Sequence, residues 1–310
     1  MKNNFAIIDI GTNSFHLIIA KVTESNYKIL KRKREVFHLR TESQNDLHTI
    51  SQENILAGFL ILEKYKKLAD KFDAKIYAFA TSALREATNK NEFISIVRRN
   101  LGFEIKVLTG NEEAELVSVG INFHFDVKNK NVLIFDLGGG STEFVFQEHS
   151  KIVYKNSLKL GAVRQTQKYF SDGNYSVESI KKCKHEIEKL INGIKIDEEK
   201  IDLCFGVGGT ISSIMWMIEK NIFDIDHHYQ LIPNYKITRK NFEIIKKKVY
   251  QLAIENKLDE LKAIDKQRKR IILAGIFIVE SIFDKFSLKE IIASNISIRE
   301  SFLIKQVFHN

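Results

Sequence analysis

The stretch Val132-Leu-Ile-Phe-Asp-Leu-Gly-Gly-Gly-Ser-Thr-Glu-Phe-Val-Phe146 decides the fold. It begins with four apolar residues, as a strand buried on both faces would. Asp136 lies at the end of that strand, and the glycines 138–140 permit a tight turn whose backbone N–H groups can point at an anion. Residues 144–146 are apolar again, so the stretch predicts a β-hairpin with a glycine loop at its tip. A carboxylate beside such a loop suits a phosphate with a divalent cation, although a plain hairpin with a solvated aspartate fits the same pattern.

The same pattern occurs near the N-terminus, in Phe5-Ala-Ile-Ile-Asp9-Ile-Gly-Thr-Asn-Ser-Phe-His-Leu-Ile-Ile-Ala20. In both stretches an apolar strand is followed by aspartate, an aliphatic residue, glycine, small residues and serine. Repetition at this distance along the chain indicates a duplicated domain. Two half-molecules that each carry a phosphate hairpin predict a cleft between them, in which a phosphate chain is held from both sides.

A third glycine motif lies in Leu203-Cys-Phe-Gly-Val-Gly-Gly-Thr-Ile-Ser212, where a predicted strand ends and a helix begins. Backbone amides at the N-terminus of a helix bind anions, so this motif predicts a further phosphate or nucleotide contact. Close packing of a helix on a strand would require the same glycines, and the sequence does not separate the two explanations.

The run Thr109-Gly-Asn-Glu-Glu-Ala114 opens a predicted helix that ends near Phe123. Acidic residues in a first helical turn are stabilised by the helix dipole, which would explain both glutamates structurally. Glu113 could instead point toward the strand ends and act as a general base. The sequence alone leaves both explanations open.

The remaining segments predict alternating strands and helices. Strands are expected at 27–36, 74–80, 103–108, 151–158 and 289–293. Helices are expected from Ser51 onward, near Asn91, at 177–192, 237–258 and 270–283, and from 296 to the C-terminus.

Size and composition favour a two-domain globular protein with polyanionic partners. A chain of 310 residues predicts about two domains, and 44% apolar residues suffice for a core. The net charge of +9 favours polyphosphate, nucleotides or nucleic acid as partners. Nucleic acid is disfavoured because no module of aromatic and basic residues is present. Without a signal peptide or an apolar run of membrane-spanning length, we expect a cytoplasmic protein that contacts no membrane.

These motifs together resemble the exopolyphosphatase / guanosine pentaphosphate phosphohydrolase (Ppx/GppA) family, which belongs to the actin, Hsp70 and sugar-kinase superfamily. The matching motifs, in family order and at family spacing, are Asp9-Ile-Gly-Thr-Asn-Ser-Phe-His16, Ala80-Thr-Ser-Ala-Leu-Arg85-Glu-Ala87, Thr109-Gly-Asn-Glu-Glu113-Ala114, Asp136-Leu-Gly-Gly-Gly-Ser-Thr-Glu143, Gly206-Val-Gly-Gly-Thr210 and Ile298-Arg299-Glu300. The resemblance implies an α/β fold of two ribonuclease-H-like domains in the short form of the family. Domain I is expected at 1–124 and 296–310, and domain II at 125–295.

The resemblance also implies roles for individual residues. Glu113 matches the catalytic glutamate that activates water, and Arg85 matches an arginine that grips the phosphate being cleaved. Asp136 and Glu143 match the acidic residues around the divalent cation, Mg²⁺ or another, and Asp9 is a further metal candidate. The candidate phosphate ligands of the three glycine motifs are Gly11, Thr12, Asn13, Ser14, Gly138, Gly139, Gly140, Ser141, Thr142, Gly208, Gly209 and Thr210.

Three positions depart from the family pattern. Thr12 replaces a common serine and keeps the hydroxyl, and Ser297-Ile298 stands where a glycine often precedes the final Arg-Glu. The loop at 39–47 has no glycine where the family has a glycine-rich loop. This last departure bears on the rim of the cleft and leaves the preferred substrate open.

The resemblance therefore implies a metal-dependent hydrolase that releases orthophosphate processively from inorganic polyphosphate. Removal of the terminal 5′ phosphate from guanosine pentaphosphate, giving the tetraphosphate, is the alternative within the family, because both substrates end in the same phosphoanhydride. A sensor that binds guanosine penta- or tetraphosphate without turnover is an alternative from another class. An ATP-using kinase would need an acceptor pocket, of which the sequence shows no sign. A homodimer is expected from the family's short form.

Overall fold

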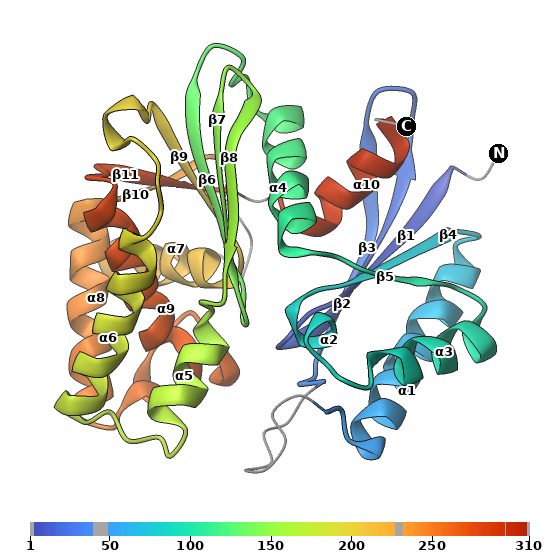
Figure 1. The fold of residues 1–310 in the computed structure, drawn as a ribbon, viewed down its shortest axis with the longest axis horizontal. Coiled ribbons are helices and arrows are strands. Elements are labelled where there is room, and N and C mark those ends of the chain that lie inside the picture. The colour runs from blue at the N-terminus through green and yellow to red at the C-terminus, as the bar shows by residue number, and fades with distance from the viewer. Residues whose placement is uncertain (1–2, 40–48, 227–231, 295, 309–310) are drawn as a thin grey trace. The chain divides into compact units, whose positions relative to one another are not determined.

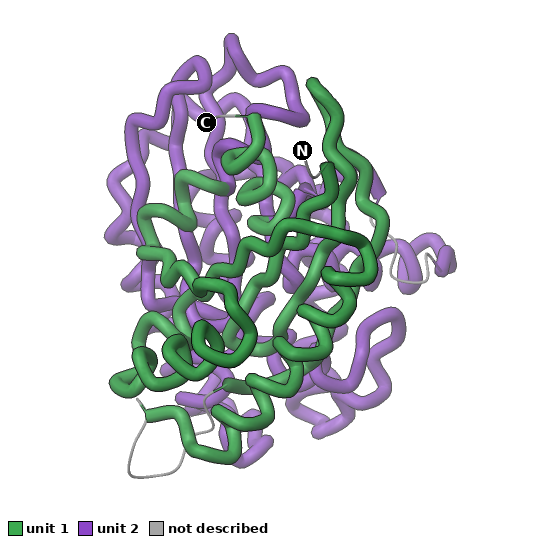
Figure 2. Tube along the Cα trace, turned by 90° about the vertical axis from the view of Figure 1, so that its right-hand side faces the viewer, with its two compact units in different colours: residues 1–116, 298–310 green, residues 117–297 purple. Residues whose placement is uncertain are grey.

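The computed structural model describes residues 3–39, 49–226, 232–294 and 296–308 (Figure 1). The chain divides into two compact units (Figure 2). Unit 1 comprises residues 1–116 and 298–310, and unit 2 comprises residues 117–297. The domain bounds expected at 124/125 and 295/296, and the expected cleft, stay predictions.

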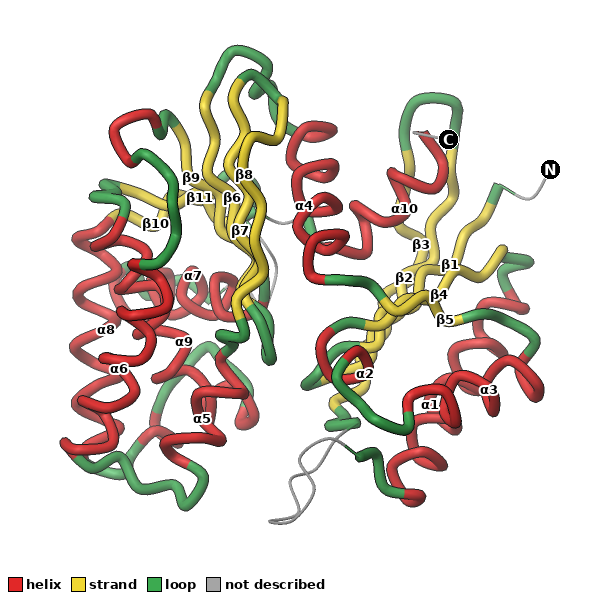
Figure 3. The backbone as a smooth tube through the Cα atoms, viewed as in Figure 1, coloured by secondary structure: helices red, strands yellow, loops and turns green. Residues whose placement is uncertain are grey.

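Unit 1 is built on a five-stranded sheet with helices on both faces (Figure 3). The strand order is β3-β2-β1-β4-β5, in which β1, β2 and β3 form an antiparallel meander and β4 and β5 run parallel to β1. The strands are β1 (Asn4–Ile10), β2 (Ser14–Val22), β3 (Tyr27–Val36), β4 (Lys75–Ala80) and β5 (Ile105–Val107). The helices are α1 (Gln52–Lys71), α2 (Ser82–Arg85), α3 (Lys90–Leu101), the first part of α4 (Gly110–His124) and α10 (Ile298–Phe308).

The continuous apolar run of β1 serves two cores, because alternate side chains of a strand point to opposite faces. Ile8 packs in the core that α1 and α3 cover. Ile7 packs in a second core on the other face, with Phe302 and Leu303 of α10. The last helix of the chain thus completes the unit with which the chain begins.

Unit 2 is built on a six-stranded sheet of order β10-β11-β9-β6-β7-β8. The strands are β6 (Asn131–Leu137), β7 (Thr142–Glu148), β8 (Lys151–Leu158), β9 (Leu203–Val207), β10 (Tyr235–Thr238) and β11 (Glu290–Ala293). The helices are α5 (Ala162–Phe170), α6 (Val177–Asn192), α7 (Gly209–Ile222), α8 (Arg239–Ile254) and α9 (Lys266–Lys285), with short 3-10 turns at Glu198–Lys200 and Leu258–Glu260.

The two sheets repeat one topology. An antiparallel three-stranded meander is followed by a strand parallel to its first member: β1, β2, β3 and β4 in unit 1, and β6, β7, β8 and β9 in unit 2. In sheet order the next strand is β5 in unit 1 and β11 in unit 2. It pairs in parallel with β4 and with β9, respectively. The predicted α/β fold with two duplicated domains is confirmed.

The expected helix at 237–258 is wrong at its start. Residues 235–238 form β10, in which Ile237 lies opposite Ile291 of β11. Thr238 ends the strand and caps α8, because its side chain accepts a hydrogen bond from the backbone N–H of Asn241 at 3.2 Å. Among the described helices, none has both the length and the apolar character that crossing a bilayer requires.

Candidate active site

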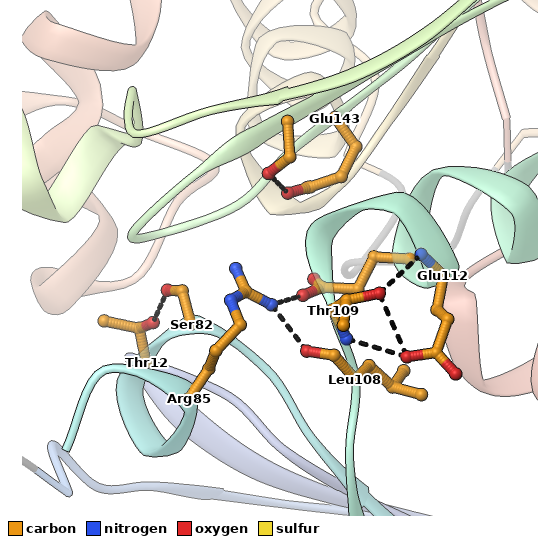
Figure 4. Close-up of polar contacts among 9 residues, drawn as sticks. Thr12, Ser82, Arg85, Leu108, Thr109, Glu112 and Glu143 are labelled. Carbon is orange, nitrogen blue, oxygen red and sulfur yellow. Dashed lines mark hydrogen bonds and ion pairs between the residues drawn. The ribbon is translucent and has the colours of Figure 1, made fainter. Parts of the chain in front are cut away.

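Unit 1 brings Arg85 and Glu113 into contact. Arg85 ends the short helix α2, directly after β4, and Glu113 lies in the first turn of α4. The Arg85 guanidinium donates from Nη1 to Glu113 Oε1 and, at 2.8 Å, to the carbonyl of Leu108 (Figure 4). Glu113 is only 5% exposed, so a buried carboxylate faces a guanidinium that is partly exposed.

Glu112, the other member of the pair, has a different set of partners. Its carboxylate accepts hydrogen bonds from the backbone N–H and the hydroxyl of Thr109, at 2.9 and 3.0 Å, while the Thr109 hydroxyl accepts from the Glu112 N–H at 3.2 Å (Figure 4). This reciprocal arrangement is a capping box. Burial would raise the pKa of Glu112, but hydrogen bonds from Lys106 and Thr109 outweigh it and lower the pKa to about 2. Glu112 therefore caps the N-terminus of α4, and Glu113 is the glutamate whose carboxylate contacts Arg85.

The first glycine loop, residues 11–14, is closed by a hydrogen bond from the Gly11 N–H to the Ser14 carbonyl at 3.1 Å. The hydroxyl of Thr12 lies 3.0 Å from that of Ser82, at the start of α2 (Figure 4). The Nδ2 atom of Asn13 is buried and has no acceptor among the described residues. An acceptor such as a phosphate oxygen would satisfy this buried amide donor.

Asp9, at the end of β1, is paired within unit 1. Its Oδ2 accepts a hydrogen bond from Arg299 Nη1 of α10 at 2.9 Å. Burial raises the pKa of Asp9, and the neighbouring Arg299 offsets this only in part. This role of Arg299 is not apparent from the sequence, because Asp9 lies 290 positions earlier in the chain.

The second glycine loop repeats the closure of the first. The Gly138 N–H donates to the Ser141 carbonyl at 3.0 Å. Thr142 is fully buried, and its hydroxyl donates to the carbonyl of Leu160. That hydroxyl is therefore engaged by the main chain, which leaves the backbone amides of the loop and Ser141 as the expected phosphate ligands.

Asp136 and Glu143 lie directly opposite each other on β6 and β7. Glu143 is 3% exposed and accepts a hydrogen bond from the hydroxyl of Ser157 at 2.8 Å (Figure 4). Carboxylate oxygens are the ligands that a divalent cation such as Mg²⁺ prefers. The described residues hold no group of three or more His, Cys, Asp or Glu side chains suited to a metal ion. Two carboxylates that share a cation with substrate phosphates are nevertheless the usual way in which proteins bind Mg²⁺.

The third glycine motif lies against the end of β6. Gly208 has a φ of +103°, and a Cβ at this position would lie 2.5 Å from the Leu137 carbonyl oxygen and 3.0 Å from Asp136 Oδ1. Glycine is therefore required here, and the third glycine motif lies beside the Asp136 side chain in unit 2.

Gly209 and Thr210 face α9. A Cβ on Gly209 would lie 2.0 Å from the guanidinium of Arg268, so a side chain at this position would require the long Arg268 side chain to move. Thr210 is 2% exposed, and its methyl group would lie 2.6 Å from a Cβ on Gly275. Close packing of α7 on α9 therefore accounts for the position of Thr210, whereas the alternative left open by the sequence was packing of a helix on a strand. The glycine-free loop lies, from residue 40 onward, outside the described residues.

Comparisons with known proteins agree on one family. The model of the Ppx/GppA phosphatase family matches residues 18–309. A bifunctional 3-dehydroquinate synthase/phosphatase of Fusobacterium nucleatum is 35% identical over 309 residues; the match covers 94% of this chain but 45% of that protein. The crystal structure of an Aquifex aeolicus Ppx/GppA family member has a TM-score of 0.83 and 27% identity, covering 99% of this chain and 98% of that one. An exopolyphosphatase structure from Cytophaga hutchinsonii shares the fold, with a TM-score of 0.87, 20% identity and coverage of 99% and 98%.

Proposed function

The chain belongs to the Ppx/GppA phosphatase family, and we propose that it hydrolyses the terminal phosphoanhydride bond of inorganic polyphosphate. The observation that carries this proposal is the contact of Arg85 with the buried Glu113, beside a Glu112 whose carboxylate caps its helix. Hydrolysis of a phosphoanhydride by water needs a positive group that binds the phosphate, here the Arg85 guanidinium, and a base that accepts the proton of the water, here the Glu113 carboxylate.

In the proposed mechanism, the terminal phosphoryl group takes hydrogen bonds from Arg85 and from the amides of the glycine loops. Phosphate oxygens compete with Glu113 for the guanidinium, so substrate binding frees the carboxylate to accept a proton. Glu113 takes that proton from the attacking water as the oxygen–phosphorus bond forms. The bond from phosphorus to the bridging oxygen breaks in line with the attack, and the shortened chain leaves as an anion.

Asp136 and Glu143 are the residues that would hold Mg²⁺ or another divalent cation. Their carboxylates lie opposite each other beside the second glycine loop and are oxygen ligands of the kind that such an ion prefers. When bound, it would supply positive charge that stabilises the leaving phosphate. Asp9, the third metal candidate, has Arg299 as its counter-charge, which favours a role in holding the loop over direct metal binding.

The experiment that tests this proposal compares the two neighbouring glutamates. Phosphate release from long-chain polyphosphate and from guanosine pentaphosphate is measured with Mg²⁺ for the wild type, Glu113→Gln and Glu112→Gln. We expect Glu113→Gln to lower kcat on the order of a hundredfold or more, because the general base is lost. The matched variant Glu112→Gln should keep kcat and lose about 1 kcal/mol of stability, because only the helix cap is weakened.

The ratio of the two wild-type rates identifies the substrate. Faster phosphate release from guanosine pentaphosphate than from polyphosphate would show that guanosine pentaphosphate is the preferred substrate. Binding of either compound without turnover would favour a sensor over a hydrolase. Equal losses of kcat in the two glutamate variants would contradict the assignment of Glu113 as the base.

A further inference from the structure

The first turn of α5 makes three hydrogen bonds to the second glycine loop, one to each of three consecutive carbonyls. The Ala162 N–H donates to the carbonyl of Gly138 at 3.1 Å, and the Arg164 N–H donates to that of Gly139 at 3.0 Å. The Arg164 side chain donates from Nε to the carbonyl of Gly140 at 2.7 Å. Arg164 therefore holds two neighbouring peptide groups of the loop.

The direction of these carbonyls fixes the direction of the loop amides. In a trans peptide group the C=O and the following N–H point in opposite directions, and the peptide bonds of this loop are trans. Because the carbonyls of residues 138, 139 and 140 turn toward α5, the N–H groups of Gly139, Gly140 and Ser141 turn away from it. Successive N–H groups on one side of a loop form an anion-binding concavity.

The approach of α5 to the loop is as close as a backbone permits. Gly161 precedes the helix, and a Cβ at this position would lie 2.3 Å from the Gly139 carbonyl oxygen. A side chain larger than glycine at 161 would push the loop away from α5. The N-terminus of α5 therefore packs directly against the backbone of the loop, and the Arg164 side chain adds a third hydrogen bond between them.

The first glycine loop has a different support. Its Asn13 carbonyl accepts from the Phe37 N–H on the strand side, at 3.3 Å. Thr12 contacts Ser82 through its hydroxyl. The hydrogen bond from the Arg164 side chain supports the second loop, which lies beside Asp136 and Glu143.

We propose that Arg164 is a positioning residue for phosphate binding: it fixes the Gly140 peptide so that the Ser141 N–H points at the bound phosphate. This inference rests on the proposed function, because it assigns the second glycine loop to the substrate. In this role Arg164 acts through the main chain of the loop and not by direct contact with the phosphate.

The test measures binding of inorganic tripolyphosphate to the full chain by calorimetry, at several ionic strengths, together with kcat, KM and the melting temperature. Arg164→Ala should weaken tripolyphosphate binding and raise KM, each by about tenfold, the loss typical of one well-placed hydrogen bond. The dependence of affinity on salt should equal that of the wild type, because no charge in contact with the phosphate is removed. Arg99→Ala, which removes an exposed arginine of α3, is the matched control and should change none of these values.

A second variant reaches the same loop without any change of charge. Gly161→Ala should also weaken binding, and the double variant with Arg164→Ala should lose less than the sum of the single losses, because both act on one loop conformation. If Arg164→Ala fails to fold, Arg164→Lys, which keeps the charge but lacks the planar Nε donor, takes its place and should show the same loss.

Each other outcome overturns the inference. Unchanged tripolyphosphate affinity in Arg164→Ala would show that the hydrogen bond from the Arg164 side chain is not needed. A weaker dependence on salt would show that Arg164 touches the phosphate directly. If the wild type binds tripolyphosphate without hydrolysing any phosphoanhydride, the proposed hydrolysis fails while the binding comparison still decides the role of Arg164. If the wild type does not bind it, both proposals fall together.

Discussion

Glu112 and Glu113 are neighbours in the chain, yet their carboxylates serve different parts of the molecule. The spacing from Thr109 to Glu112 is that of a capping box, so a sequence signal for the structural role of Glu112 was present. The resemblance implies that Arg85 and Glu113 act on the same phosphate, and the structure brings the two side chains into contact. The partners of Arg164 and Arg299 could not be predicted, because one bonds to main-chain carbonyls and the other to a residue 290 positions away.

The capping role of Glu112 has a pH dependence of its own. The pKa of Glu112 is lowered to about 2 in the folded chain, so its contribution to stability is fully present above the unfolded value of 4.5. It is lost as the pH falls from 4.5 toward 2. The difference in unfolding free energy between the wild type and Glu112→Gln should therefore stay constant from pH 7 to pH 5 and shrink below. Denaturant melts at each pH measure this difference, and a difference that grows on acidification would exclude the capping role.

At the scale of elements, the two hairpins, the meanders and the duplication follow from local apolar patterns, and the structure confirms them. The strand β10 was missed because it has four residues and pairs with β11, more than fifty positions later. Its sequence, which includes Ile237, also continues the helical pattern of α8. A short edge strand of this kind is specified by its partner more than by its own residues.

The edge strand β3 carries a prediction about association. Its residues Lys31 and Lys33 are exposed and share one face of the strand. Exposed lysines on an edge strand prevent pairing with the edge of another chain. We expect the double variant Lys31→Val, Lys33→Val to raise light scattering at micromolar concentration without loss of melting temperature.

The matched control for this prediction places the same two substitutions on a helix. Lys181→Val with Lys189→Val changes two exposed lysines of α6 and offers no unpaired strand edge. It should scatter no more light than the wild type. Equal scattering by the two double variants would attribute the effect to lost charge and would contradict protection of the edge.

At the scale of the whole chain, unit 1 is discontinuous, because its last helix comes after all of unit 2. The ring of Phe302 stacks on that of Phe79, with centroids 4.8 Å apart. The apolar residues of α10 alone do not say which sheet they cover. The family resemblance predicted that the last helix returns to the first domain. The local periodicity of the sequence could not predict this.

Truncation of Phe302 should therefore act on the first unit. Phe302→Ala removes a ring that is 4% exposed, and we expect a loss of about 3 to 4 kcal/mol from unit 1. Hydrogen exchange followed by mass spectrometry should show faster exchange in β1, β2 and β4. The strands β6 and β9 should keep their protection, because Phe302 packs in a core that is built from unit 1. Equal acceleration in both units would show that they unfold as a single cooperative body.

The three carbonyls that turn toward α5 have a consequence for selectivity. A surface of peptide N–H groups recognises negative charge and tetrahedral shape, and it does not distinguish what the phosphate is attached to. Mutation can change side chains around such a surface but cannot change the amide groups that compose it. Members of one family can therefore acquire different preferred substrates through residues farther along the bound molecule, while the part that grips the terminal group stays the same.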